Sequence, residues 1–300
     1  MFSFNSEQMS GNVTDTFLER VQPVLMAEGI LSFILNSMFL FVLARNKDLV
    51  KRQRITYHVA NLALADTLVG LSLFMTATIR RGIVHVHIDC LDWLQRINQG
   101  AIFLSFMAVF FMAFERVVVI KWPFTWKEIL TLKRVFVAIF ITWITAVILV
   151  IIPFPNTYHN LTKSNLFVII FFFCGIAIFI ANVVIACLLQ YQKRKLAAIV
   201  GTQQTTNCSK EKALKLVITI NIIFAVTCVP FGVTYLTISI CVLSRLYCNF
   251  NVLFIFRDVT QYLYVLGYAN FIVNPIIYIW RTNTYRKAFY SMFKKNINTT

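Results

Sequence analysis

Apolar residues gather in long runs that short polar stretches separate. Six runs contain no Asp, Glu, Lys or Arg and a seventh contains only Asp66; they cover 29–44, 55–79, 97–114, 135–162, 164–192, 216–244 and 259–280. A helix that spans a bilayer needs about 20 mostly apolar residues. The first run reaches that length with its flank from Val24, so the pattern predicts seven membrane-spanning helices.

The segments between the runs are too short to form a separate soluble domain. We therefore expect an extracellular N-terminal segment over 1–23, a helical bundle over 24–280 and a tail over 281–300. The first 22 residues lack the apolar core of a secretory signal peptide. The first helix is therefore expected to act as its own insertion signal.

Charge is scarce and unevenly placed. Charged residues make up 13% of the chain, against roughly 25% in soluble domains. The net charge of +16 invites a nucleic-acid partner, but 21 of the 28 Lys and Arg lie on one side of the expected membrane, with the C terminus. Positive loops stay cytoplasmic, so the N terminus is expected outside. The basic excess is a topology signal, with attraction to anionic lipid as a second effect, and no nucleic-acid partner is expected.

Glycosylation sequons agree with this orientation. Asn12 and Asn160 each begin an Asn-x-Thr sequence on the expected outer side and are candidate glycosylation sites. Two further sequons, at 207–209 and 298–300, fall inside and are expected to stay unmodified.

Polar side chains also occur within the apolar runs. Asp66 lies near the centre of its run, where a carboxylate costs about 2.5–3.5 kcal/mol on insertion scales. A lone acid could insert protonated or pair with a neighbouring helix. Polar residues at similar depth in other runs favour an acid that faces the bundle interior and organises ions or water; they are Asn36, Ser105, Asn270 and Asn274.

Two prolines interrupt the last two runs. Pro275 removes a backbone donor and bends its helix, and Pro230 has the same effect one run earlier. In lipid, the carbonyls that a proline frees need partners, which side-chain amides or water can supply. Two bent helices beside a buried polar cluster form a plausible moving part.

Five motifs follow one another along the chain: Leu62-Ala63-Leu64-Ala65-Asp66, Glu115-Arg116-Val117, Trp143, Pro230 and Asn274-Pro275-Ile276-Ile277-Tyr278. Together they resemble the motifs of rhodopsin-like (class A) G-protein-coupled receptors, and the resemblance covers about residues 24–293. Each motif is weak alone, but their order and spacing are specific. The resemblance implies an all-α membrane protein, a seven-transmembrane helix bundle with a short amphipathic C-terminal helix. The implied partners are a heterotrimeric G protein, an unknown extracellular ligand and membrane lipid, at the plasma membrane.

The resemblance also assigns roles to residues. The buried ion and water site would comprise Asn36, Asp66, Ser105, Asn270 and Asn274, with a sodium ion on Asp66 as the one bound ion and no other cofactor. Arg116 would meet the G protein, and Glu115 would hold it at rest. Tyr278 would swing inward on activation, while Pro230 and Pro275 bend the helices that move.

A ligand would bind in the outer half of the bundle. The implied pocket residues are Asn98, Gln99, Ile102, Cys228, Phe231, Tyr235, Tyr264 and Tyr268. Amine receptors of this class carry an acid where this chain has Asn98, so an amine agonist is not expected. Opsins carry a lysine where this chain has Tyr268, which excludes a covalent retinal.

Other departures from the family narrow the subgroup. Cys228 stands where a tryptophan usually precedes the proline of helix six, and helix five has no proline. The second outer loop is short and lacks cysteine, as in melanocortin-like receptors. Melanocortin sites use several acids to bind a cationic peptide, whereas the positions here are neutral: Thr76, Gln95 and Asn98.

The cysteines leave two disulfides open. Cys241 and Cys248 both lie near the outer loop between helices six and seven, and a local bridge between them is predicted. A bridge from Cys90 to Cys248 is the alternative. Cys90 also lies near His85, His87 and Asp89, but this single loop has no second pair at the spacing of a zinc site.

The segment after Trp280 has amphipathic spacing. Apolar residues recur at helical intervals between basic ones, at Tyr285, Phe289, Met292 and Phe293. This pattern predicts a helix that lies on the inner membrane surface.

Two other classes of function were considered beside a ligand-gated receptor. A transporter or channel is disfavoured because seven helices do not divide into equal repeats and the polar residues form a compact cluster instead of a pore-lining stripe. A receptor fold that signals without a soluble agonist remains open because Cys228 replaces the usual tryptophan. No nucleophile–base or metal set indicates an enzyme.

Overall fold

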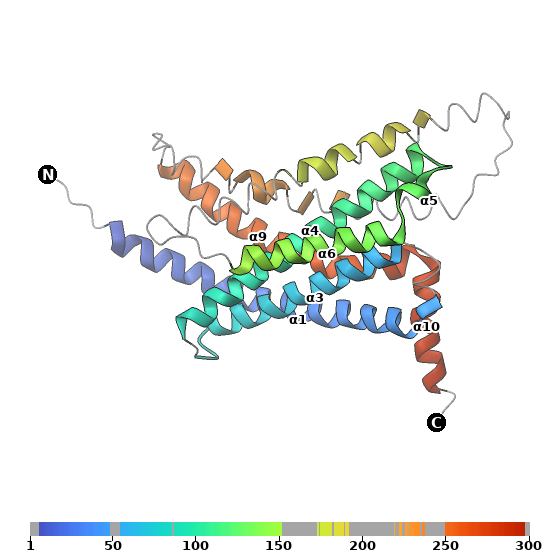
Figure 1. Cartoon of the computed structure of the whole chain (residues 1–300). Coiled ribbons are helices and arrows are strands. Elements are labelled where there is room, and N and C mark those ends of the chain that lie inside the picture. Colours follow the sequence, from blue (N-terminus) through green and yellow to red (C-terminus); the bar gives the residue numbers. More distant parts are fainter. Residues whose placement is uncertain are drawn as a thin grey trace.

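Helices account for every regular element in the described part of the chain (Figure 1). The structure, a computed structural model, describes residues 6–48, 55–85, 87–151, 173, 175–181, 183–188, 190–191, 219, 222–223, 226–227, 229–234, 236–237 and 250–297. The helices are α1 (Ser6–Arg45), α3 (Ile55–Arg80), α4 (Ile88–Lys121), α5 (Trp126–Ile129), α6 (Leu132–Ile151), α9 (Phe250–Arg281) and α10 (Asn283–Ile297).

Five segments among the described residues are long and apolar enough to cross a membrane. They are Val21–Arg45, Ile55–Arg80, Asp89–Lys121, Leu132–Ile151 and Tyr262–Trp280, and they match five of the seven predicted runs. The runs over 164–192 and 216–244 lie mainly outside the described residues, although 175–181, 183–188 and 229–234 are helical.

The first helix begins earlier than the apolar pattern predicted. α1 starts at Ser6 and passes through Pro23 without ending, whereas the span was expected from Val24. A helix satisfies its own backbone hydrogen bonds, so it can continue from an apolar span into a polar stretch.

Two glycines allow α1 and α3 to pack with their backbones almost in contact. A Cβ on Gly70 would lie 2.6 Å from the backbone nitrogen of Phe33 and 2.8 Å from the carbonyl oxygen of Gly29. A Cβ on Gly29 would lie 2.7 Å from the backbone nitrogen of Phe74. Because lipid tails are as apolar as leucine, close packing of small residues is a main source of helix association in membranes.

The bundle core lies between α1, α3, α4 and α9. Its most buried large side chains include Phe39, Leu62, Met112 and Tyr278, all with at most 1% of their surface exposed. Large apolar side chains on the outer faces remain exposed, Phe140 at 65% for example. Apolar side chains on the outer surface are expected where lipid, not water, surrounds the protein.

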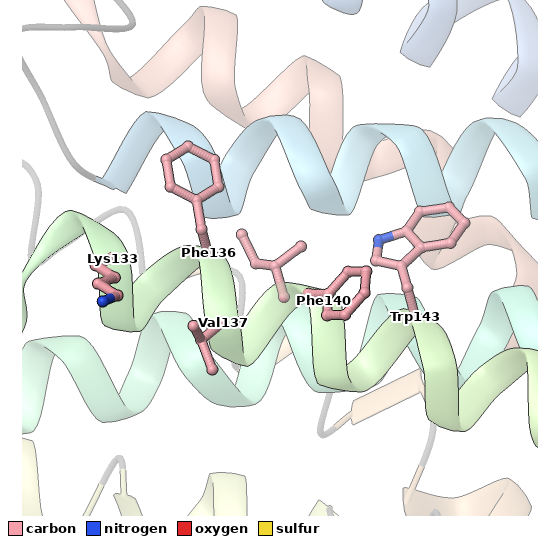
Figure 2. A pocket seen from close by; sticks show the side chains of 6 residues that line it. Lys133, Phe136, Val137, Phe140 and Trp143 are labelled. Carbon is pink, nitrogen blue, oxygen red and sulfur yellow. The ribbon is translucent and has the colours of Figure 1, made fainter.

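An open apolar groove runs along the outer face of α6 (Figure 2). It has a volume of about 590 Å³ and is lined by Lys133, Phe136, Val137, Ile139, Phe140 and Trp143. On the neighbouring α3, Tyr57 packs edge-on against Phe136 with ring centroids 5.1 Å apart. The groove therefore belongs to the surface that faces the surrounding lipid.

After α9 ends, the chain turns sharply and α10 crosses the end of the bundle, as Figure 1 shows. Tyr285 and Ala288 are buried, whereas Arg286 and Lys287 are exposed. One face of α10 thus packs on the bundle and the opposite face is basic, which agrees with the amphipathic pattern in the sequence. Below, the end of the bundle near this helix is called the α10 end, and the other is called the opposite end.

Candidate functional site

The carboxylate of Asp66 is the centre of a buried polar network. Asp66 lies midway along α3 and is fully buried. Ser105 on α4 donates its hydroxyl to Oδ1 at 2.6 Å, and Asn274 on α9 donates its side-chain amide to Oδ2 at 2.7 Å. Each carboxylate oxygen therefore has a donor from a different helix, as a buried acid requires.

Asn36 on α1 connects the same region to the proline bend of α9. Pro275 has no N–H, so the carbonyl of Phe271, four residues earlier, loses its helical donor. The side-chain amide of Asn36 donates to this carbonyl at 2.9 Å. A side chain from another helix thus repairs the hydrogen bond that the proline removes.

Ser32 also belongs to the network, although the sequence analysis did not predict it. Its hydroxyl donates to the backbone carbonyl of Asp66 at 3.1 Å, and Asn36 donates to the Ser32 carbonyl at 2.9 Å. Ser32 precedes Asn36 by four residues, so both lie on one face of α1. That spacing was the only available signal.

Several oxygen atoms near this network lack protein hydrogen-bond donors. The side-chain oxygens of Asn36 and Asn270 are buried, with no partner among the described residues, and both residues are at most 2% exposed. Hard cations prefer oxygen ligands, and a carboxylate, a hydroxyl and amide oxygens are ligands of this kind. The chemistry of the predicted ion-site residues therefore fits a small cation.

Tyr278 lies next to the network in the core. Its ring is completely buried, and its centroid is 5.1 Å from that of Phe39 on α1. The phenol oxygen meets no hydrogen-bond partner within the described ranges. A buried hydroxyl without a partner costs free energy, so a different position of the ring that gives the hydroxyl a partner would be favoured.

At the α10 end, Glu115 and Arg116 form a largely buried pair. Nη2 of Arg116 is 3.8 Å from Oε1 of Glu115, and the two side chains are 12% and 6% exposed. Nε2 of His58 on α3 is 3.6 Å from the other oxygen of Glu115. The sequence interpretation did not single out His58.

A hydrogen bond ties α10 to the bundle beside this pair. The hydroxyls of Thr56 and Tyr285 are 3.1 Å apart. Burial raises the pKa of Tyr285 to about 12, so its phenol stays protonated. Its ring also meets Phe39 edge-on, with centroids 5.5 Å apart. Phe39 therefore contacts both Tyr278 and Tyr285.

Toward the opposite end, Asn98 and Tyr268, two residues of the predicted pocket, lie in contact. The Tyr268 hydroxyl donates to Oδ1 of Asn98 at 2.7 Å, and Nδ2 of Asn98 donates to the Ser72 hydroxyl at 2.9 Å. The hydroxyls of Tyr264 and Tyr268 lie 3.0 Å apart. Every member of this second network is a neutral group.

The other predicted pocket residues are only partly placed. Phe231 packs on Tyr264 with ring centroids 5.9 Å apart, and Ile102 packs against the core beside Tyr268. Gln99 is half-buried on α4. Cys228 and Tyr235 lie outside the described residues. The helical piece at 229–234 contains Pro230, whose carbonyl accepts from the Thr234 hydroxyl at 3.1 Å.

Glu28 is an acid in the first part of the apolar span of α1, and the pocket prediction left it out. Its Oε2 is buried, with no hydrogen-bond partner in the described part of the chain. It follows Leu25 by three residues, and Leu25 shares a cluster with Tyr268. Helical spacing from Leu25 could have revealed its inward face.

Trp143 bonds to a residue that the motif comparison did not include. Its indole N–H donates to Oδ1 of Asn61 on α3 at 2.9 Å. This bond fixes α6 against α3 on the face that Figure 2 shows.

Most of the predicted covalent sites lie outside the part of the chain that the structure describes. Cys241, Cys248 and Asn160 lie outside the described residues, as does the side chain of Asn12. Cys90 is exposed and forms no disulfide within the described ranges. Those ranges contain no cluster of three or more His, Cys, Asp or Glu that could hold a metal.

Comparison with known families places these contacts in context. Residues 35–278 match the sequence model of a family described as 7 transmembrane receptor (rhodopsin family). The match covers most of the chain and includes Asn36, Asp66, Ser105 and Asn274 of the buried network, and also the Glu115–Arg116 pair. A comparison with curated proteins gave no match.

Proposed function

Because the chain belongs to the rhodopsin family of seven-transmembrane receptors, we propose that an extracellular ligand binds near Asn98 and Tyr268 and that a G protein binds at the α10 end. Membership confirms the predicted fold class and makes the chain a multi-pass plasma-membrane receptor that signals through heterotrimeric G proteins. Proteins of this family are receptors and not enzymes. Family membership also argues against the transporter and channel alternatives.

The distribution of positive charge supports an outside N terminus. Lys and Arg concentrate in the stretches that would connect the helices at the α10 end, and positive loops stay cytoplasmic. The basic face of α10 would then meet anionic lipid of the inner leaflet. In this orientation, the Asn98–Tyr268 network lies in the extracellular half of the bundle.

The neutral outer network constrains the ligand. Asn98 and Tyr268 bond to each other, so a ligand with a neutral polar group could replace either partner. A carboxylate at position 98 is missing, which argues against an amine anchored there. Tyr268 offers no amine for a Schiff base with retinal. The melanocortin-like subgroup remains a prediction that the family match does not support.

Sodium is the ion that the Asp66 network is proposed to hold. The carboxylate of Asp66, the hydroxyl of Ser105 and the amide oxygens of Asn36 and Asn270 would supply oxygen ligands. A bound cation would balance the buried charge of Asp66. It would also join four helices in one packing.

Activation is then a shift between two packings of the bundle. At rest, the Asp66 network ties α1, α3, α4 and α9 together, and Glu115 holds Arg116. A ligand that binds the second packing more tightly increases its population. Release of Arg116 would expose it to the G protein. Tyr278, whose hydroxyl meets no hydrogen-bond partner among the described residues, could gain one.

The Glu115–Arg116 pair carries this proposal, and replacement of Arg116 by alanine tests it. G-protein sensors in cells, read during a ligand screen, should respond to the wild-type chain and give no response to Arg116→Ala at equal surface density. Arg134→Ala is a matched control, because Arg134 is exposed and its side chain has hydrogen bonds only to the backbone carbonyls at 128 and 129 among the described residues. Signalling by Arg116→Ala at the wild-type level would refute the proposed role of Arg116.

Ligand-independent signalling is the second candidate, and the same sensors separate it. Cys228 stands where the family usually has tryptophan, so the resting packing lacks one large side chain. Sensor activity that rises with receptor density and without added ligand would favour this candidate. Activity that appears only with a ligand would favour the first.

A further inference from the structure

His58 is a buried polar side chain to which the account above gives no role. It lies on α3 and is 3% exposed. Its ring stacks on Phe111 of α4 with centroids 6.2 Å apart. A polar ring within a membrane span is costly unless its polar atoms meet partners. The groups near its nitrogen atoms therefore indicate its role.

Among the described residues, the carboxylate of Glu115 lies near two nitrogen-bearing side chains, both at ion-pair distances that are longer than a hydrogen bond. One oxygen faces Nη2 of Arg116 at 3.8 Å, and the other faces Nε2 of His58 at 3.6 Å. The pair with Arg116 lies within α4, whereas the contact with His58 joins α4 to α3. Because the His58 and Glu115 side chains are 4% and 6% exposed, water screens their contact little.

We propose that His58 is a positioning residue for activation. By engaging the second oxygen of Glu115, it keeps the carboxylate turned toward Arg116 and stabilises the resting packing. This inference rests on the proposed role of Arg116. It adds a restraint between two helices that the Glu115–Arg116 pair alone does not provide.

The surroundings of the ring indicate which nitrogen carries the proton. Nδ1 is buried and meets no hydrogen-bond partner within the described ranges. A bare ring nitrogen tolerates such a place better than an N–H group does. The proton of the neutral ring is therefore assigned to Nε2, which faces Glu115.

The length of the acid fits this arrangement. Glutamate extends its carboxylate about 1.5 Å further from the backbone than aspartate does. Glu115→Asp should therefore weaken the contact with His58 while preserving the charge.

Basal guanine-nucleotide exchange in membranes, at matched receptor density, tests the role of His58. His58→Leu removes the donor and should raise basal exchange by about fivefold or more. His58→Gln should stay near wild type, because a glutamine amide nitrogen can reach the position of Nε2. Thr142→Val is the control for loss of a buried polar group, since the Thr142 hydroxyl bonds to the Ile139 carbonyl of its own helix at 2.7 Å.

A double-mutant cycle separates positioning from packing. Glu115→Gln should raise basal exchange alone, and His58→Leu should add less than about twofold in that background. If His58→Leu adds its full factor there, or if His58→Gln behaves like His58→Leu, the inference is wrong. Should His58→Leu fail to reach the surface, His58→Asn replaces it, because asparagine keeps the amide but lacks the reach.

The outcome is distinguishable from failure of the proposed function. If Arg116→Ala leaves exchange intact, the role of Arg116 itself is wrong. If Arg116→Ala abolishes exchange and His58→Leu leaves the basal rate unchanged, only the role of His58 is rejected.

Discussion

Replacement of Ser105 by alanine removes one of the two described donors to the Asp66 carboxylate. The bond is 2.6 Å long, and Ser105 is 1% exposed, so water cannot replace the lost hydroxyl without entering the core. Hydrogen bonds between membrane helices average about 0.6 kcal/mol, whereas bonds to charged groups contribute about 1.5–3 kcal/mol. Because the bond is short and its acceptor is a carboxylate, we expect its loss to lower the free energy of unfolding by about 1.5 kcal/mol. At about 2 °C per kcal/mol for chains of this size, the melting temperature should fall by about 3 °C.

Thermal unfolding of the purified receptor in detergent, followed by fluorescence, measures this shift. Thr142→Val, which loses a hydroxyl bonded within its own helix, should change the melting temperature by less than about 1 °C. In an Asp66→Asn background, Ser105→Ala should have at most half of its effect, because the acceptor no longer carries charge. An unchanged melting temperature for Ser105→Ala, or an equal loss in the Asp66→Asn background, would refute the reasoning.

Three further predictions concern packing, ion binding and covalent structure. Gly70→Ala should reduce the amount of folded receptor at the surface, because its Cβ would collide with the backbone of α1. Gly267→Ala is the control, since its Cβ would have open space, and it should be neutral or stabilising by about 0.5–1 kcal/mol. Equal surface levels of the two variants would contradict the close packing of α1 and α3. Sodium chloride should raise the melting temperature of the wild-type chain above that in choline chloride, and Asp66→Asn should lose this difference; no sodium effect would remove the ion from the account. Peptide mapping without reduction should recover Cys241 joined to Cys248, and a free Cys248 would reject both disulfides that the sequence allows.

The Asp66 network could be located from the sequence because its members are conspicuous. An acid or an amide inside an apolar run has few structural explanations, and these residues recur at similar depth in several runs. The structure joins Asp66, Ser105 and Asn274 directly through hydrogen bonds. It joins Asn36 to α9 at the carbonyl that Pro275 frees.

Apart from Ser105, whose depth in its run matches that of Asp66, hydroxyl side chains give no comparable signal. Thr78, for example, donates to the Phe74 carbonyl of its own helix at 2.6 Å, so a hydroxyl in a span need not face another helix. Ser32 bonds across to α3 and looks the same in sequence. His58 was equally ambiguous, because its partner depends on how α3 and α4 pack.

Helix packing was the least predictable feature. The apolar runs give the length of each span but not its rotation about its axis, and that rotation decides which small residues meet. Gly29 and Gly70 lie in different runs, and only the structure shows that their backbones touch. The start of α1 at Ser6 could not be predicted from the apolar runs either, because a run shows which residues can lie in the membrane and not where the helix begins.

The central claim is that Arg116 transmits the state of the bundle to a G protein, and reconstitution tests it most directly. The purified chain in lipid nanodiscs would be mixed with purified heterotrimers of each class, and the rate of guanine-nucleotide exchange would be measured. The account predicts exchange above that of empty nanodiscs for at least one class and its loss in Arg116→Ala. Exchange at the same rate with Arg116→Ala, or none with any class by the folded wild-type chain, would contradict it.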